Sequence, residues 1–257
     1  MIDLTERKLK ILQAIITDFI QNAEPVGSRT LSRMLDLNIS PATIRNEMAD
    51  LEEMGYLYHP HTSSGRIPSD KAYRLYVNRM MDRYELEESE KRRIKRELKA
   101  HMSELEKTVR HASELLSDIT NLTSFATLGD VRDMSLFLQG MTRIFAHPEY
   151  NRIEQARSFL EMVDDRERLA NEVASRGEGL KITIGDENSE RITPGSTIIS
   201  ATYRVDGHVV GKLGVIGPTR MKYGEITSVI EYMSNNLDKA FKMIEGGDRK
   251  SDDEDKE

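Results

Sequence analysis

The sequence contains no cysteine and no tryptophan, and only 6% of its 257 residues are aromatic. Without cysteine the chain forms no disulfide and offers no thiolate to a metal ion or a substrate. It also lacks an apolar run long enough to span a bilayer, and its start, MIDLTERKLK, is too charged for a signal peptide. We therefore expect a cytoplasmic protein of one large domain or two to three small ones.

Positive charge is scarce as well. The chain has 37 Lys and Arg against 44 Asp and Glu, a formal net charge of −7, which argues against indiscriminate binding of nucleic acid. Residues 1–80 are neutral, with ten basic and ten acidic side chains. From Asp248 the sequence is almost wholly charged and predicts a solvated acidic tail.

Three helices are predicted before residue 56. Apolar residues recur at helical spacing from Leu4 to Ile20, with Thr5 as a cap and Pro25 as the stop. Ser28 is expected to cap a short second helix that ends at Leu35. The third helix has Ser40 as its N-cap and Pro41 at its first position, buries Ile44, Met48 and Leu51, and stops at Gly55.

The stretch after Gly55 predicts a hairpin. Tyr56–Tyr58 and Arg66–Pro68 are short extended pieces joined by a polar turn. Three helices followed by such a hairpin indicate a winged helix-turn-helix, in which the third helix enters the major groove of DNA. We expect the cations near this helix to cluster on its outer face, with Glu52 and Glu53 elsewhere. For Lys71 two interpretations stay open: a phosphate contact or a solvated charge.

The candidate DNA contacts lie on three segments. The outer face of the third helix offers Arg for guanine and Asn for adenine. The start of the second helix and the hairpin turn offer hydroxyls and Arg for phosphates or the minor groove. The predicted contacts are Ser28, Arg29, Thr30, Ser40, Thr43, Arg45, Asn46, Thr62, Ser63, Ser64 and Arg66.

Three segments in order resemble one family. PVGSRTLS at 25–32, ATIRNEMADLEEMGYL at 42–57 and PHTSSGRIPS at 60–69 are similar to the N-terminal domain of the heat-inducible transcription repressors, the HrcA family. The resemblance implies a dimer that binds an inverted-repeat operator of chaperone genes, is kept active by a chaperonin and loses activity on heat shock. The alternative is a regulator whose C-terminal domain senses a small molecule.

A long helix is predicted beyond the hairpin. After a shorter helix that Ser69 caps, a pattern rich in Glu, Lys and Arg runs from Leu86 to Leu122. Its apolar residues alternate in steps of four and three, which is a heptad seam: Leu98, Met102, Leu105, Val109, Ala112, Leu116 and Ile119. The seam is either a dimer coiled coil or one face packed on the next domain.

The rest of the chain predicts a mixed α/β domain. We expect helices at 134–145, 153–173 and a last one that carries residues 226–241. Strands are expected at 180–184, 197–203 and 208–216, with Asp206-Gly207 as a tight turn. The motifs LFLQGMTRIF, ITIGDEN and GKLGVIGPTRMKYGEITSVIEYM resemble the GAF-like C-terminal domain of the same family.

One departure from the family pattern concerns the centre of the chain. Members usually carry an additional stretch between the counterparts of Thr123–Leu128 and Leu136–Gly140, which supplies strands and a subdomain used in dimer contacts. Here only GDVRDMS separates them. The resemblance therefore implies a smaller sheet and a dimer that rests on other surfaces, in either a natural short form or an internal deletion.

Two further patterns contain residue types that can bind an anion or a metal ion. Gly214, Gly217 and Arg220 lie in GVIGPTRM, which is either an anion-binding loop or a tight strand-to-helix connection, the second being favoured. His59 and His61 form an H-x-H pair without a nearby third ligand, so we expect no metal and no cofactor. No nucleophile elbow or catalytic set is present, and we expect no enzyme.

These observations combine into an α+β architecture. We expect a winged helix-turn-helix DNA-binding domain at 1–83, a long linking helix at 84–122, a small GAF-like domain at 123–245 and an acidic disordered tail at 246–257. The function expected is a dimeric repressor of heat-shock operons that binds double-stranded DNA, with a chaperonin as a further partner and no membrane.

Overall fold

The computed structural model describes residues 4–35, 39–61, 64–100, 105–129, 134–151, 153–188, 195–205 and 207–237. The chain divides into two units. The first holds the described residues up to Asp82 together with Thr219–Tyr223, and the second holds those of Arg83–Pro218 and those from Gly224 onward. Among the described residues, no helix is both long and apolar enough to cross a membrane.

The first unit begins with three helices, α1 (Glu6–Asn22), α2 (Ser28–Met34) and α3 (Pro41–Glu53). The predicted caps of α1 and α3 are confirmed, since Thr5 and Ser40 accept hydrogen bonds from the amides of Lys8 and Thr43. Two boundaries differ from prediction. Ala23, in a left-handed conformation, ends α1 before Pro25, and Gly27 rather than Ser28 is the N-cap of α2.

A two-stranded antiparallel hairpin and a fourth helix complete the first unit. Strand β1 (Leu57–Tyr58) pairs with β2 (Ile67–Pro68), and α4 (Asp70–Arg79) follows with Ser69 as its cap. The hairpin is tied to the chain before α2, because Val26 and Arg66 exchange two backbone hydrogen bonds of 2.9 and 3.0 Å. Apolar faces of the four helices meet in the core: Ile11, Leu12, Ile15, Ile16, Leu31, Ile44, Met48, Leu51 and Tyr73.

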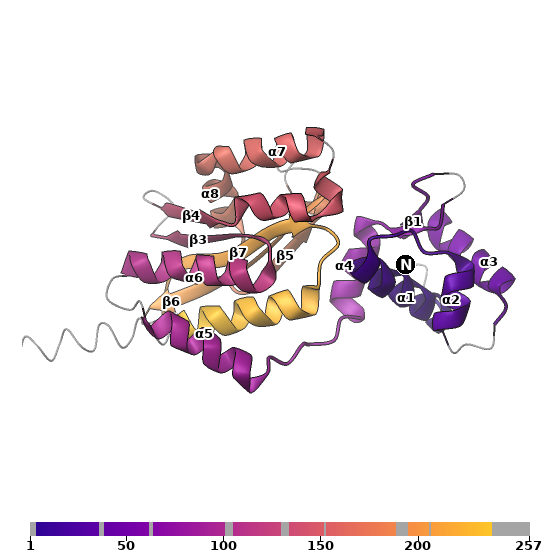
Figure 1. The fold of residues 1–257 in the computed structure, drawn as a ribbon, viewed down its shortest axis with the longest axis horizontal. Helices are drawn as coiled ribbons and strands as arrows, with labels where there is room; N and C mark the ends of the chain where they lie inside the picture. The colour runs from indigo at the N-terminus through magenta and orange to yellow at the C-terminus, as the bar shows by residue number, and fades with distance from the viewer. Residues whose placement is uncertain are drawn as a thin grey trace, which may run out of the picture. The chain divides into compact units, whose positions relative to one another are not determined.

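The second unit is built on a five-stranded antiparallel sheet in the order β4-β3-β7-β6-β5. Its strands are β3 (Thr123–Leu128), β4 (Ser135–Gln139), β5 (Lys181–Ile184), β6 (Ser196–Val205) and β7 (His208–Pro218). Helices α7 (Ile153–Asp164) and α8 (Arg166–Ser175) cover one face, and α6 (Leu105–Thr120) and the helix at 223–237 cover the other (Figure 1). This mixed α/β architecture is consistent with a GAF-like domain.

The predicted helix at 134–145 is wrong. Its first part is strand β4, and a 3-10 helix (Met141–Ala146) follows. Phe137 is buried, while Leu136 and Leu138 pack against the core cluster beneath α7 and α8. Because both faces of the strand contact protein, its sequence lacks the alternation of apolar and polar residues that identifies a half-buried strand.

The predicted helix at 153–173 is two helices. α7 ends at Asp164, and Asp165 caps α8 by accepting a hydrogen bond of 3.1 Å from the Arg168 amide. The strands predicted at 180–184, 197–203 and 208–216 are confirmed as β5, β6 and β7. Val205 lies opposite His208, as a two-residue turn requires, and Gly207 has a φ of +84°.

The long linking helix is not continuous in the structure. Helices α5 (Glu88–Ala100) and α6 lie side by side rather than end to end (Figure 1). Of the predicted seam, Leu98, Val109, Ala112 and Leu116 are buried, and α6 packs on the sheet through β3 and β4. Met102 lies outside the described residues. Val109, Ala112 and Leu116 of the seam therefore serve the core of their own unit, whereas Leu105 is exposed.

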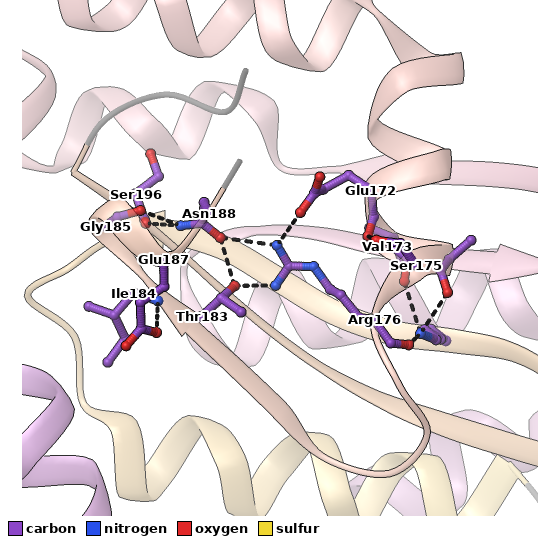
Figure 2. A network of polar contacts seen from close by, with 12 residues as sticks. Glu172, Val173, Ser175, Arg176, Thr183, Ile184, Gly185, Glu187, Asn188 and Ser196 are labelled. Atoms are coloured by element: carbon purple, nitrogen blue, oxygen red, sulfur yellow. Dashed lines mark hydrogen bonds and ion pairs between the residues drawn. The ribbon is translucent and has the colours of Figure 1, made fainter. Parts of the chain in front are cut away.

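A buried polar network joins α8 to the far edge of the sheet, and Figure 2 shows it around Arg176. The guanidinium of Arg176 bonds Glu172, Thr183 and Asn188, and Asn188 donates to the carbonyls of Gly185 and Ser196. Burial lowers the pKa of Arg176. The motif ITIGDEN at 182–188 thus supplies partners that a buried cation requires.

Lys212 forms hydrogen bonds to carbonyl groups at the C-terminal end of α8. It is buried in β7, and its ammonium donates to the carbonyls of Val173, Ala174 and Arg176. Burial is the main cause that lowers the pKa of Lys212, and the nearby charge of Arg176 adds to it. The last carbonyls of a helix have no partner within the helix, and a cation there satisfies them.

Gly214 and Gly217 lie within strand β7, opposite Ser200 and Thr197, so the strand predicted to end at residue 216 continues to Pro218 and neither glycine lies in a loop. A Cβ at Gly214 would come within 2.3 Å of the Ile199 carbonyl oxygen and 2.5 Å of the Phe125 ring. The glycine is therefore explained by close packing of strand and ring.

We expect Gly214→Ala to lower the free energy of unfolding of the second unit by about 1–3 kcal/mol, because neither backbone nor buried ring has room to move. Urea unfolding followed by circular dichroism measures the change. Gly177→Ala is the matched control, since its Cβ would meet only the flexible end of Lys181. Equal stability of the two variants would contradict the packing explanation.

Candidate nucleic-acid interface

The exposed face of α3 presents Arg45 and Asn46 to solvent. Neither side chain has a hydrogen bond or ion pair among the described residues. The helix is fixed beneath them by buried Ile44, Met48 and Leu51 on the opposite side. An arginine and an asparagine on a rigid helix can form bidentate hydrogen bonds to base edges without giving up an internal partner.

Two carboxylates of α3 are neutralised by α1. Glu47 lies 2.7 Å from the Lys8 ammonium and 3.4 Å from Arg7, and Asp50 lies 2.9 Å from Lys8. Hydrogen bonds to Glu47 and Asp50 raise the pKa of Lys8. These pairs hold α1 and α3 together and reduce the negative charge on α3 that would repel phosphates.

Glu52 lies against the hairpin, contrary to the expectation that it is remote from Arg66. Its carboxylate accepts from Arg66 Nε at 3.1 Å and lies 3.3 Å from His59 Nδ1. The side chain of Arg66 is only 13% exposed. This ion pair, with the backbone bonds to Val26, fixes the base of the hairpin against α3.

These elements enclose a hollow of about 410 Å³. It is lined by the start of α2, by α3 and by the hairpin, with Ser28, Arg29, Arg45, His59, Ser64 and Arg66 among its residues. Arg29 and Arg45 are exposed and have no ion pair among the described residues. The structure thus brings together cations from three segments that the sequence predicted as one surface.

The remaining predicted DNA contacts differ in their exposure to solvent and in their hydrogen bonds within the chain. Thr30 is exposed and Ser28 is buried. The hydroxyls of Ser40 and Thr43 bond each other at 3.1 Å, and Ser64 bonds the backbone of His61. Thr62 and Ser63 lie outside the described residues. Arg29, Thr30, Arg45 and Asn46 are therefore the predicted contacts whose side chains are exposed and have no hydrogen bond or ion pair among the described residues.

Two residues near this surface have roles that their types alone did not reveal. Lys71 donates to the carbonyl of Met54 at 2.7 Å and lies 4.3 Å from the centroid of the Tyr56 ring. It therefore stabilises the end of α3, where a cation is favourable. His59 Nδ1 lies 3.3 Å from the Glu52 carboxylate, and nothing in the sequence signals that contact.

Arg220 belongs to the segment Thr219–Tyr223 of the first unit. It donates from Nη1 to the Ile20 carbonyl at 2.8 Å, near the end of α1. Tyr223 packs against Tyr73 of α4 with ring centroids 6.0 Å apart. Because Gly214 and Gly217 lie in strand β7, they do not form an anion-binding turn together with Arg220.

Comparison with known proteins agrees with this architecture. A family model described as HrcA protein C terminal domain matches residues 68–227. The heat-inducible transcription repressor HrcA of Clostridioides difficile (strain 630) is 33% identical over 332 aligned positions, which cover 90% of this chain and 98% of that protein. The repressor of the same name from Clostridium tetani is also 33% identical, with 94% and 97% covered.

Among solved structures, a hypothetical protein determined at 2.2 Å resolution shares the fold. It has a TM-score of 0.78 and 21% sequence identity, and the match covers 94% of this chain and 100% of that one. The alignment of 332 positions to the Clostridioides difficile protein is longer than the 257 residues of this chain. That relative therefore contains segments that have no counterpart here.

The fold and these relatives define the class, which is a transcription repressor and not an enzyme. More narrowly, the chain belongs to the HrcA family of heat-inducible transcription repressors. Repression of transcription implies contact with DNA, and the first unit carries the surface described above.

We expect Ser40→Ala to reduce the free energy of unfolding of the first unit by about 1 kcal/mol, because the N-cap of α3 is lost. Ser40→Asp should retain the cap and the stability, since aspartate caps as well as serine. Urea unfolding monitored by circular dichroism compares the two variants. An alanine variant as stable as the parent would show that the cap contributes nothing.

Proposed function

We propose that α1–α3 and the hairpin β1–β2 form a winged helix-turn-helix that binds operator DNA. In this proposal α3 enters the major groove, where Arg45 and Asn46 contact base edges. Arg29 and Thr30 at the start of α2, together with the hairpin, contact the phosphate backbone. The observation that supports it most strongly is the free Arg45 and Asn46 on a helix on which three carboxylates, Glu47, Asp50 and Glu52, are each paired with a cation.

The proposed operator is an inverted repeat upstream of chaperone genes, bound by two copies of the chain. Each copy would occupy one half-site, because a two-fold arrangement of recognition helices matches a palindromic sequence. A net charge of −7 disfavours tight nonspecific binding, so affinity should depend on two simultaneous specific contacts. Heat stress would relieve repression, and a chaperonin would keep the repressor active.

The test is a binding titration of the full chain against an inverted-repeat duplex and a scrambled duplex of equal length, at two salt concentrations. The proposal expects selective binding to the inverted repeat, with two copies per duplex in analytical ultracentrifugation. Weak binding to both duplexes with the same steep salt dependence would overturn operator recognition. One copy per duplex would overturn the dimeric part alone.

We expect Arg45→Ala to remove most of the preference for the operator, a loss of about 1–3 kcal/mol in discrimination, because a bidentate contact to a base is lost. The fold should be unchanged, since Arg45 has no partner among the described residues. Arg157→Ala is the control of equal charge, on α7 in the second unit and exposed. Unchanged discrimination in the Arg45 variant would remove this residue from base recognition.

Arg66→Lys tests the different role that the ion pair suggests for the hairpin. Lysine keeps the charge but loses the planar fork on Glu52, so we expect weaker binding to operator and scrambled DNA alike, by about threefold to tenfold. The titration described above measures both affinities. A selective loss for the operator would instead make Arg66 a base contact.

A further inference from the structure

The second unit has a hollow of about 620 Å³ along strand β4, and this size is within the range of small-molecule sites. All its lining residues belong to the second unit, so the hollow is separate from the DNA surface. Its base is formed by Ser135–Leu138 of β4, and α6 and α8 contribute the sides.

Strand β4 is an edge strand. It pairs with β3 on one side, and no other described strand pairs with its second side. In an antiparallel sheet alternate residues of an edge strand direct their backbone N–H and C=O groups away from the sheet. The hollow therefore combines the backbone of a strand edge that no other described strand covers with the apolar side chains of Leu136 and Leu138, which are only partly buried.

The α8 side of the hollow carries Arg166, Glu167, Ala170 and Asn171. Residues four apart share one face of a helix, so Arg166 lies beside Ala170 and Glu167 lies beside Asn171, and all four border the same hollow. The guanidinium of Arg166 and the amide of Asn171 are exposed and have no hydrogen bond or ion pair within the described part of the chain. Both can donate to a ligand.

The α6 side carries Arg110, which is already engaged. Its guanidinium lies 4.7 Å from the centroid of the Phe137 ring and pairs with Glu106 at 3.1 Å. Arg110 therefore makes a cation–π contact with Phe137, whereas Arg166 remains available for a bidentate contact with a ligand. Glu167 contributes a negative charge to the same hollow, which disfavours a ligand with two negative charges.

We propose that this hollow binds an amphipathic organic monocarboxylate. The carboxylate accepts a bidentate pair of hydrogen bonds from Arg166, and Asn171 donates a further one. The apolar body of the ligand lies along Leu136, Leu138 and Ala170. A phosphate monoester, which carries nearly two charges at neutral pH, binds less well because of Glu167. This site adds a ligand to the repressor and does not depend on how the first unit binds DNA.

Octanoate is the probe, added to the full chain with 13C-labelled leucine and alanine methyl groups. We expect saturable shifts of the Leu136, Leu138 and Ala170 methyl resonances, while leucines of the first unit stay unchanged. Arg166→Gln should weaken binding about tenfold or more, because a charged hydrogen-bonding partner is lost. 1-Octanol, which keeps the apolar body without the charge, and octyl phosphate should both bind more weakly than octanoate.

Arg168→Gln is the matched control, since Arg168 is an exposed arginine on the same helix that does not line the hollow. Its affinity for octanoate should stay within about twofold of the parent. Unchanged core methyl resonances establish that both variants are folded. Equal binding by the Arg166 and Arg168 variants, or shifts that spare Leu136 and Leu138, would overturn the proposal. The DNA titration is unaffected by either result.

Discussion

Pairing of Glu47, Asp50 and Glu52 on α3 is the constraint on which the DNA surface depends. The chain is acidic overall and its first eighty residues are neutral, so a cationic surface exists only where carboxylates are held by other partners. Lys8 and Arg7 of α1 hold Glu47 and Asp50, and Arg66 holds Glu52. The same ion pairs attach α3 to α1 and to the hairpin. Stability and charge distribution therefore arise from one set of contacts, and breaking one of them would affect both.

Much of the first unit was predictable because its signals are local. The signals of α3 are its N-cap Ser40, Pro41 at its first position, and the apolar residues spaced from Ile44 to Leu51. The hydroxyl of the cap acts on an amide only three residues away. The partners of Glu52 were not predictable. His59 and Arg66 lie seven and fourteen residues away, and only the fold of the hairpin brings them to the carboxylate. For this reason the prediction that Arg66 lies in the hairpin is confirmed, whereas its ion pair with Glu52 was not predicted.

In the second unit, the spacing of apolar residues does not by itself identify the secondary structure or the packing partner of each segment. Strand β4 contacts protein on both faces, and its run SLFLQ carries no alternation that separates it from a helix. The heptad pattern of α6 is real, yet a stripe of this spacing packs equally well on a sheet or on a second helix, and the sheet is its partner here. The sequence does not reveal why position 214 is a glycine, because the Phe125 ring that excludes a Cβ there lies 89 residues earlier in the chain. Such errors come from contacts distant in sequence, which local patterns do not encode.

The burial of the α6 seam also bears on how two copies would meet. Val109, Ala112 and Leu116 are committed to the sheet, so a coiled coil through these residues would expose the core of each copy. The edge of β4 is a weaker candidate for pairing of two sheets, since α6 and α8 flank it and leave a hollow along the strand. Side chains that border an edge strand on both faces hinder the approach of a second sheet, but they leave room for a small ligand along the strand. The geometry that disfavours β4 as a dimer edge is thus the geometry that favours it as a ligand site.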